Sequence, residues 1–230
     1  ILSQALEERG IYIGTHIERL GGVSDRRFSG NTAQITEQIK AIADMDFAVF
    51  DPERGKQMRE AVMAARADGD SVGGVLETAV TGMPAGVGEP WFDTVEGLLS
   101  HALFSIPAVK GVEFGDGFAL ADMRGSQSND PLRACGGRAV AQSNRCGGIG
   151  GGITMGSPMI FRCAVKPTPS ISREQQTVNL GTGENTTLTI KGRHDPAIVH
   201  RARIVVDSMT AITLADMLAV RYGTDWLAGR

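Results

Sequence analysis

Several features are scarce in this 230-residue sequence, and each scarcity excludes a class of protein. The sequence contains no uninterrupted apolar run of about 18 residues, so we expect no segment that spans a bilayer. The opening stretch ILSQALEERG has acidic residues by position 7 and lacks a long apolar core. We therefore expect no signal peptide at this position.

Neither sign of charge is in large excess, and cysteines are few and far apart. The sequence has 23 Lys and Arg against 26 Asp and Glu, a formal charge of −3, which gives no reason to expect a nucleic acid or an anionic membrane as partner. The spacing of Cys135, Cys146 and Cys163 argues against a metal site of the zinc type and against a disulfide framework. Such usage is typical of a reducing compartment, so the prediction is a cytoplasmic protein.

The composition that remains is that of a globular chain. Hydrophobic residues make up 42% and charged residues 21%, and the length is sufficient for a sizeable core. We see neither internal repeats nor an obvious linker, so residues 1–230 are predicted to form a single domain.

Helical and strand patterns alternate along the chain. Helices are predicted over residues 1–9 and 31–45, from Asp51-Pro52, over 93–106, and over 195–222. Strands are predicted over residues 11–20, 71–81, 109–114, 153–165 and 186–190, with a long loop over 125–150. The prediction is an α+β fold in which sheets and helices form layers.

Two helix details are specific enough to test. Asp93 and Glu96 suggest a variant of the capping box at the start of the fourth helix. Asp195-Pro196 is expected to open the last helix. The apolar stripe expected on that helix consists of Ile198, Ala202, Val205, Met209 and Ile212.

The stretch SNRCGGIGGGITMGSP, residues 143–158, contains six glycines. Each costs about 0.5–1 kcal/mol of backbone entropy relative to alanine, so the stretch is either a flexible surface loop or a backbone that must approach something closely. It is not a P-loop, because Ser157-Pro158 follow its last glycine. It is not a dinucleotide motif either, because Ile153 stands where the third glycine belongs. Spacing alone favours the flexible loop.

Two cation-containing runs lie downstream of the glycines: KPTPSI at 166–171 and KGRHDP at 191–196. The second places three cationic side chains beside the expected start of a helix: Lys191, Arg193 and His194. Exposed N–H groups and the helix dipole favour anions at that point, so an anion site is one interpretation. The alternative is that Asp195 merely caps the helix while the cations are solvated.

Six motifs, in this order, resemble those of the chorismate synthase family, and together they cover nearly the whole chain. They are GDSVGGVLE (69–77), MPAGVGEPWFD (83–93), ALFSIPAVKGVEFGDGF (102–118), CGGIGGGITMGSP (146–158), KPTPSI (166–171) and GRHDPAIV (192–199). Each motif alone is modest, but the ordered set is highly specific.

The resemblance implies a carbon–oxygen lyase of the shikimate pathway. The family removes phosphate and a proton from 5-enolpyruvylshikimate 3-phosphate in a 1,4-elimination that yields chorismate, towards the aromatic amino acids. The reaction needs reduced FMN without net redox change, and NADPH is a candidate reductant of that flavin. Family members are soluble homotetramers built as a layered sandwich of antiparallel sheets and helices.

The resemblance also implies roles for particular residues. The expected FMN-binding residues are Pro107, Ala108, Gly151, Lys166, Pro167, Thr168, Pro169, Ser170 and Arg193. Asp195 is the candidate for assisting proton removal, and no metal is implied. On this view the glycines near Gly151 would let the backbone pass close to a flavin.

The sequence departs from the family pattern in several places. Pro169 stands where the family often has Ser, Pro107 where many members have Asn, and Asp207 where Glu is usual. The larger departure is that no part of this sequence corresponds to an N-terminal segment of the family pattern. That segment carries the two histidines assigned to proton transfer and several substrate-binding arginines. We expect this chain to correspond to the central and C-terminal part of the family pattern.

The four histidines of this chain do not replace that pair. His16, on a candidate strand, and His101, on a helix, are expected to be structural, and His200 is expected on the surface. His194 lies in the expected motif, but one residue cannot fill both proton-transfer roles.

Three interpretations follow. The favoured one is part of a normal chorismate synthase. The second is a non-catalytic module that binds flavin or assembles with partners. The third is a structural fragment with exposed strand edges.

Overall fold

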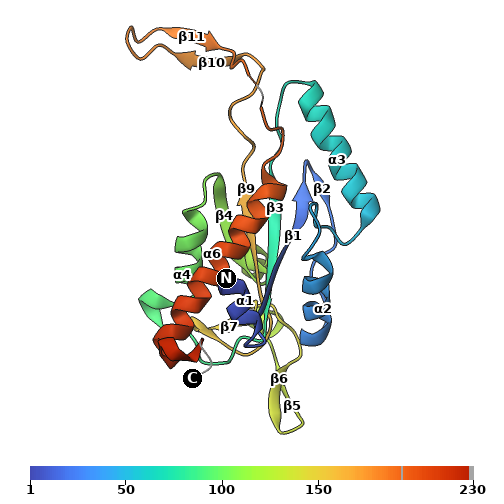
Figure 1. Cartoon of the computed structure of the whole chain (residues 1–230), viewed down its shortest axis with the longest axis vertical. Coiled ribbons are helices and arrows are strands. Elements are labelled where there is room, and N and C mark those ends of the chain that lie inside the picture. The colour runs from blue at the N-terminus through green and yellow to red at the C-terminus, as the bar shows by residue number, and fades with distance from the viewer. Residues whose placement is uncertain (193, 228–230) are drawn as a thin grey trace.

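The computed structural model describes residues 1–192 and 194–227. Its centre is a five-stranded antiparallel sheet with the order β2-β1-β3-β9-β4 (Figure 1). The strands are β1 (Tyr12–Leu20), β2 (Val23–Ser24), β3 (Gly74–Thr81), β4 (Val109–Phe114) and β9 (Met159–Val165). The α+β layered architecture predicted from the sequence is therefore confirmed.

The strand register brings distant segments together at one end of the sheet. Val165, at the end of β9, is paired with Gly74 at the start of β3 and with Val109 at the start of β4. We call this the Val165 end. The other end of β9 begins at Met159, which is paired with Val80 near the end of β3.

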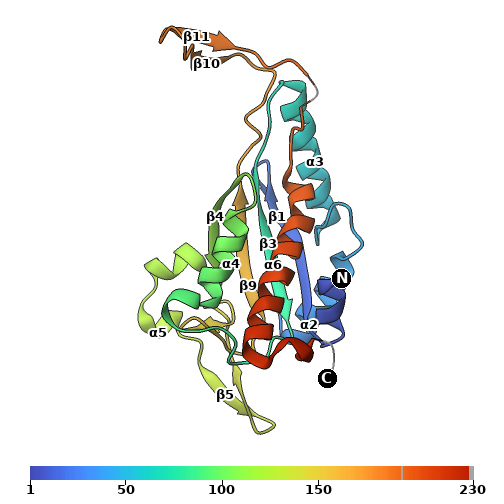
Figure 2. The same ribbon diagram turned by 60° about the vertical axis from the view of Figure 1, so that its left-hand side comes forward.

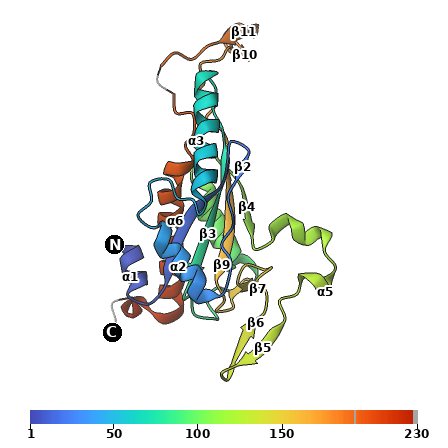
Figure 3. The same ribbon diagram turned by 90° about the vertical axis from the view of Figure 1, so that its right-hand side faces the viewer.

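Helices cover both faces of the sheet (Figures 1 and 2). The first face carries α1 (Leu2–Glu7), α4 (Val95–Phe104) and α6 (Val199–Tyr222), and the second carries α2 (Thr32–Ile42). The face assignment follows from neighbouring residues of β1, because Thr15 contacts α6 whereas Gly14 packs against Ile39 of α2. The long helix α3 (Pro52–Ala67) extends along the sheet towards the Val165 end (Figure 3).

The main core lies between the sheet and α1, α4 and α6. Its fully buried side chains include Leu6, Ile17, Leu76, Leu99, Phe161 and Leu214. A smaller core under α2 contains Phe28, Ile35, Ile39, Ile42, Ala48 and Ala79. In the part of the chain that the structure describes, no helix combines the length and the apolar character needed to cross a membrane.

Smaller elements surround this body. They are α5 (Gly125–Ser128), the 3₁₀ helices η1 (Trp91–Asp93), η2 (Gly117–Asp122) and η3 (Thr224–Trp226), and the antiparallel pairs β5 (Leu132–Cys135) with β6 (Arg138–Ala141), β7 (Ile149–Gly150) with β8 (Ile153–Thr154), and β10 (Gln175–Val178) with β11 (Asn185–Leu188). The β10–β11 hairpin projects away from the body beyond the Val165 end (Figures 1 and 3).

Local signals in the sequence explain several helix starts. Asn31 accepts a hydrogen bond from the backbone of Gln34 and completes a capping box at α2. Asp51 caps α3, with Pro52 in its first turn, as predicted. The cap of α4 was predicted wrongly, because Thr94 rather than Asp93 accepts from the backbone N–H of Gly97.

The last helix differs from its prediction in both start and orientation. It begins at Val199 rather than at Asp195, and residues 195–198 before it are non-helical with a bend at Pro196. Of the predicted stripe, Ile198, Ala202 and Met209 pack against the core as expected, whereas Val205 and Ile212 are exposed. The buried side of α6 instead includes Val199, Arg203, Val206, Thr210, Leu214 and Leu218.

Three further predictions need correction. The segment 125–150 contains α5 and the β5–β6 pair rather than only a loop. The strand expected over 153–165 is interrupted at residues 155–158 and becomes β8 and β9. The predicted strand at 186–190 is β11, and its partner β10 was not predicted because its residues are mostly polar and exposed.

Candidate functional site

Two of the predicted segments meet at the Val165 end of the sheet. Pro107 and Ala108 lie between α4 and β4, and Lys166 follows β9 directly. The backbone N–H of Lys166 donates a 2.9 Å hydrogen bond to the carbonyl of Ala108. Ala108 has a φ of 74°, a left-handed conformation that is unfavourable for a residue with a Cβ. Such strain is common where a backbone is held for function.

The run from Lys166 to Ser170 is anchored to the segment before β3. The hydroxyl of Ser71 donates a 2.7 Å hydrogen bond to the carbonyl of Thr168. A Cβ at Gly73 would lie 2.8 Å from the ring of Pro167, so this glycine permits the close approach. The hydroxyl oxygen of Thr168 is buried and has no hydrogen-bond partner among the described residues, which leaves it free to contact a bound group.

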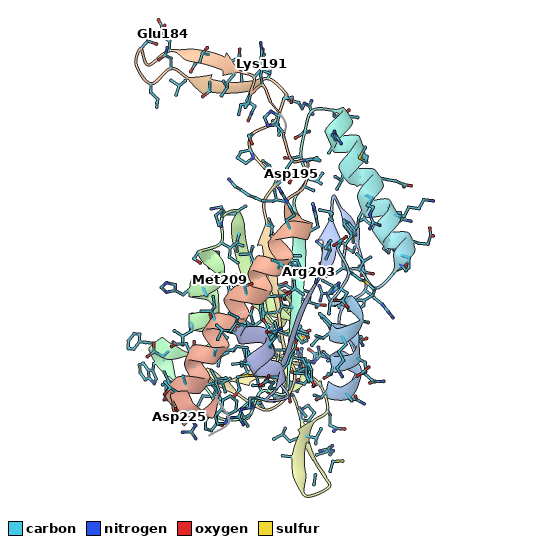
Figure 4. All side chains as sticks on the ribbon, in the orientation of Figure 1. Glu184, Lys191, Asp195, Arg203, Met209 and Asp225 are labelled. Carbon is cyan, nitrogen blue, oxygen red and sulfur yellow. The ribbon has the colours of Figure 1, made fainter. Side chains whose placement is uncertain are left out.

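The segment before α6 joins the same end of the sheet. The carbonyl of Pro196 accepts a 2.8 Å hydrogen bond from the backbone N–H of Val72. The Asp195 carboxylate accepts from the backbone N–H of Ala197 at 3.1 Å and forms an ion pair with Arg201. Asp195 therefore anchors the segment before α6 rather than capping the helix. Figure 4 shows Asp195 above the start of this helix.

His194 and Arg193 directly precede Asp195 in the same segment. The Nε2 atom of His194 lies 2.9 Å from the carbonyl of Ile190. Because a carbonyl only accepts, Nε2 is the donor and Nδ1 remains available for another group. Arg193, a predicted flavin contact, lies outside the described residues.

Gly151 is the predicted contact that this chain does not bring to the others. It lies in the β7–β8 turn, and the adjacent Gly152 accepts a hydrogen bond from the backbone N–H of Val95 at the start of α4. Pro107, in contrast, follows the end of α4, a helix of 10 residues that spans about 15 Å. Figure 1 shows β7 at the end of the sheet opposite the β10–β11 hairpin.

The glycine stretch is explained largely by packing within the chain. A Cβ at Gly147 would lie 2.5 Å from the backbone nitrogen of Gly115, and one at Gly148 would clash with the carbonyl of Pro158. A Cβ at Gly152 would lie 2.5 Å from the side chain of Thr94. Most of the stretch is therefore a close-packed backbone, and the flexible-loop interpretation is wrong. Gly151 differs, because nothing lies within 4 Å of an added Cβ there.

A buried charged network on the second face of the sheet was missed by the sequence analysis. Nε2 of His16 lies 2.9 Å from the Glu77 carboxylate, and its Nδ1 lies 3.6 Å from Asp25. Arg162 donates from Nε to Glu113 at 2.7 Å and has its Nη1 3.8 Å from Glu77. The only signal in the sequence was the charged residues within otherwise apolar strands.

The protonation of this network follows from its geometry. Burial acts to lower the pKa of His16, but the adjacent carboxylates of Asp25 and Glu77 outweigh it, so that the pKa is raised above its usual range. Burial acts to raise the pKa of Asp25, but His16 and backbone N–H groups lower it overall. The two carboxylates thus favour the protonated form of the buried His16. Glu77 and Arg162 also line a cavity of about 780 Å³ beside α2.

The three cysteines and His101 lie outside this charged network. Cys135, Cys146 and Cys163 are free thiols. Burial raises the pKa of the Cys163 thiol to about 12, which makes it a poor nucleophile. His101 is exposed on α4.

The comparisons with known proteins agree with one another. The family model described as chorismate synthase matches residues 1–219. A chorismate synthase from Korarchaeum cryptofilum is 44% identical over 216 residues, which are 94% of this chain and 58% of that protein. One from Methanosarcina mazei is 46% identical over 211 residues, 92% of this chain and 56% of that protein.

Two further comparisons extend the agreement. A chorismate synthase from Dehalococcoides mccartyi is 53% identical over 182 residues, which are 79% of this chain and 50% of that protein. A crystal structure of chorismate synthase superposes with a TM-score of 0.80 at 29% identity, covering 97% of this chain and 62% of that one. The chain thus spans between half and two thirds of the length of these relatives.

Proposed function

Because this chain belongs to the chorismate synthase family, we propose that it serves the 1,4-elimination of phosphate from 5-enolpyruvylshikimate 3-phosphate, which gives chorismate. The resemblance that the motifs indicated is confirmed at the level of the family. The reaction makes the protein a carbon–oxygen lyase of aromatic amino acid biosynthesis. Its substrate, its cofactor and the part that this chain plays are proposals.

The observation that carries the proposal is the convergence at the Val165 end. Residues 107–108 are hydrogen-bonded to the run 166–170, and residues 71–72 connect that run to residues 195–196 through two further hydrogen bonds. Ala108 holds a strained conformation at the centre of this convergence. A site assembled from three segments of the fold is what a bound cofactor requires.

The residues present fit a flavin mononucleotide. Lys166 offers a cation for the phosphate, the Thr168 hydroxyl has unused hydrogen-bonding capacity, and Pro167 and Pro169 make the run stiff. Ser170 and the Pro107–Ala108 turn would add contacts, and Arg193 and Gly151 remain predicted ones. When bound, reduced FMN supplies electron density for breaking the C–O bond.

Asp195 is the proposed proton acceptor within this chain. Its carboxylate is oriented by the N–H of Ala197 and by Arg201, so it is held in place at the edge of the convergence. An oriented carboxylate can receive a proton without searching for the right geometry. Its side chain is 30% exposed, so a substrate can reach it.

We also propose an oligomeric state, a cellular compartment and a source of reduced flavin for this protein. We infer a homotetramer, since the outer side of α6 leaves Ile204, Ile212 and Val220 exposed by 60%, 50% and 77%. We further propose a cytoplasmic protein that forms a single domain over residues 1–230 and uses FMN reduced by NADPH or by another reductase.

The test is to supply the purified chain with reduced FMN and 5-enolpyruvylshikimate 3-phosphate and to measure chorismate and released phosphate together. Equal amounts of both products support the proposal. Asp195→Asn should lower the rate at least about tenfold. Flavin binding without either product would instead favour the non-catalytic flavin-binding module, and no flavin binding would contradict both.

A further inference from the structure

A short connection, residues 68–73, leads from α3 to β3, and two of its neighbouring residues contact two different segments. The Ser71 hydroxyl donates to the carbonyl of Thr168 at 2.7 Å. The backbone N–H of Val72 donates to the carbonyl of Pro196 at 2.8 Å. The connection therefore joins the run 166–170 to the segment before α6.

The connection is itself fixed near both of its ends. The N–H of Asp70 donates to the carbonyl of Ala65, in the last turn of α3, at 2.8 Å. The N–H of Gly21 donates to the carbonyl of Gly73 at 3.1 Å. Ser71 is therefore carried by a segment that is held on both sides, and a side chain held in this way can orient the group that it contacts.

The run 166–170 has few ways to fix its own conformation. Pro167 and Pro169 have no N–H, and they restrict Lys166 and Thr168 before them to extended conformations. Among the residues that the structure describes, other segments hydrogen-bond to the run at three points. These are the pairs Lys166–Ala108, Thr168–Ser71 and Pro169–Gln175. The contact with Ser71 is the central one, so it orients the Thr168 peptide.

Gly73 allows the connection and the run to approach each other closely. A Cβ added at this glycine would lie 2.5 Å from the carbonyl oxygen of Val165 and 2.8 Å from the ring of Pro167. Both distances are shorter than a carbon atom permits, so a residue without a Cβ is needed here. The two segments are thus held at a short separation, which the short side chain of Ser71 can span.

The consequence of this contact falls on the side chain of Thr168. Its hydroxyl oxygen is buried and has no partner among the described residues, whereas a buried hydroxyl normally has one. Because the carbonyl and the hydroxyl belong to the same residue, fixing the carbonyl also limits where the hydroxyl can point. A hydroxyl that is oriented before binding loses less conformational freedom when a ligand arrives.

We propose that Ser71 is a positioning residue, which holds the run 166–170 through the Thr168 carbonyl and so orients the unpartnered Thr168 hydroxyl toward a bound group. The ordering of the run by Ser71 rests on the hydrogen bond and on the close packing at Gly73. That the bound group is the flavin rests on the proposed function.

The ordering of the run can be tested without a ligand, by amide hydrogen exchange on the whole chain. In Ser71→Ala, the N–H groups of residues 166–173 should exchange about fivefold faster or more, because one hydrogen bond is lost. Ser208→Ala is the matched control, since the Ser208 hydroxyl also donates to a carbonyl at 2.7 Å but lies on α6. Its exchange in residues 166–173 should equal that of the unmodified chain.

The effect on the cofactor is measured by titration with FMN, followed by flavin fluorescence. Ser71→Ala should weaken FMN binding about three- to tenfold, and Ser71→Thr, which returns a hydroxyl, should bind FMN within about twofold of the unmodified chain. Thr168→Val removes the hydroxyl but keeps the carbonyl, and it should weaken FMN about fivefold or more. Adding Ser71→Ala to Thr168→Val should cause little further loss, because Ser71 acts through the Thr168 hydroxyl.

Three outcomes overturn the inference. The run may exchange as slowly in Ser71→Ala as in Ser208→Ala, Ser71→Ala may bind FMN as tightly as the unmodified chain, or its loss of affinity may add in full to that of Thr168→Val. A failure of the proposed function looks different. If the unmodified chain binds no FMN while Ser71→Ala still exchanges faster, the flavin assignment is wrong and Ser71 remains the residue that orders the run. Chorismate formation with normal FMN binding by Ser71→Ala removes only the positioning role.

Discussion

The hydroxyl of Thr15 donates a 2.6 Å hydrogen bond to the carboxylate of Asp207 and so joins β1 to α6. Burial raises the pKa of Asp207 to about 6, although Thr15 and Arg203 act to lower it. Arg203 lies 4.0 Å from Asp207 but is directed mainly to the end of α2, where it donates to the carbonyls of Ile42, Ala43 and Met45. The carboxylate is thus incompletely compensated inside the core.

This pair predicts a pH-dependent effect of Asp207→Asn. The folded state keeps the Asp207 proton up to about pH 6, whereas the unfolded state loses it around the ordinary aspartate pKa of 3.8. The contribution of this group to stability therefore falls as pH rises through that window, by about 2–3 kcal/mol. Asn can still accept from Thr15 and carries no charge. In urea unfolding, Asp207→Asn should be more stable than the unmodified chain by about 2 kcal/mol at about pH 8 and nearly equal near pH 4. A difference independent of pH would contradict the burial argument.

The buried His16 predicts a second loss of stability with rising pH, this time because a stabilising charge disappears. His16→Ala leaves Asp25 and Glu77 buried without the imidazole, and only Glu77 keeps a neighbouring cation, Arg162, so the change should cost about 3 kcal/mol or more at about pH 6. Because its folded pKa is raised, the stabilisation from charged His16 is fully present below the ordinary histidine pKa of 6.5 and is lost as pH rises through the folded pKa.

The check is the free energy of unfolding of His16→Ala at about pH 6 and about pH 9, where its deficit should shrink. His101→Ala, at an exposed position, serves as control and should stay within about 0.5 kcal/mol. An equal deficit at both pH values would show that His16 acts by shape rather than by charge.

Two glycines of the 143–158 stretch should respond differently to alanine. Gly148 and Gly151 have φ values of 76° and 60°, so both substitutions share a backbone cost of about 1–2 kcal/mol. Only at Gly148 would the new Cβ also clash with the carbonyl of Pro158. Thermal unfolding should therefore show Gly148→Ala less stable than Gly151→Ala by about 2 kcal/mol. Equal losses would mean that the loop is not packed as described.

Gly151→Ala is also the informative variant for the cofactor. It should remain folded, so any loss of FMN affinity reports on contact rather than on stability. Affinity equal to that of the unmodified chain would remove Gly151 from the proposed flavin contacts.

The β10–β11 hairpin should be dispensable for the stability of the body. Its strand residues are almost all exposed, and a two-stranded hairpin is at best marginally stable alone. Replacing residues 175–188 by a two-residue turn should change the free energy of unfolding by less than about 1 kcal/mol. A larger loss in urea unfolding would show that the hairpin supports the body beyond the 3.3 Å hydrogen bond that Gln175 donates to the carbonyl of Pro169.

Several parts of the fold could be predicted because their signals are local. The caps at Asn31 and Asp51 depend only on residues within one turn, and they were predicted correctly. The strand at 109–114 was likewise found with its observed bounds, since a short apolar run between turn residues needs no distant partner to be recognised.

The buried side of α6 was predicted less well, because burial of a helix residue depends on the elements that pack against the helix. Arg203 and Thr210 are buried on α6, whereas Val205 and Ile212 are exposed. Arg203 is buried because carbonyls at the end of α2 accept its hydrogen bonds, and no periodicity within α6 encodes that contact.

The motifs of this chain by themselves determined its family and named the segments that would hold a flavin. Only the tertiary structure decided which of those segments meet, because antiparallel pairing of β3, β4 and β9 brings Ala108 against Lys166 and sets Gly151 at the far end of α4. The physical reason is that motif chemistry is local in sequence, whereas a site forms from residues that strand register and helix packing bring together through space.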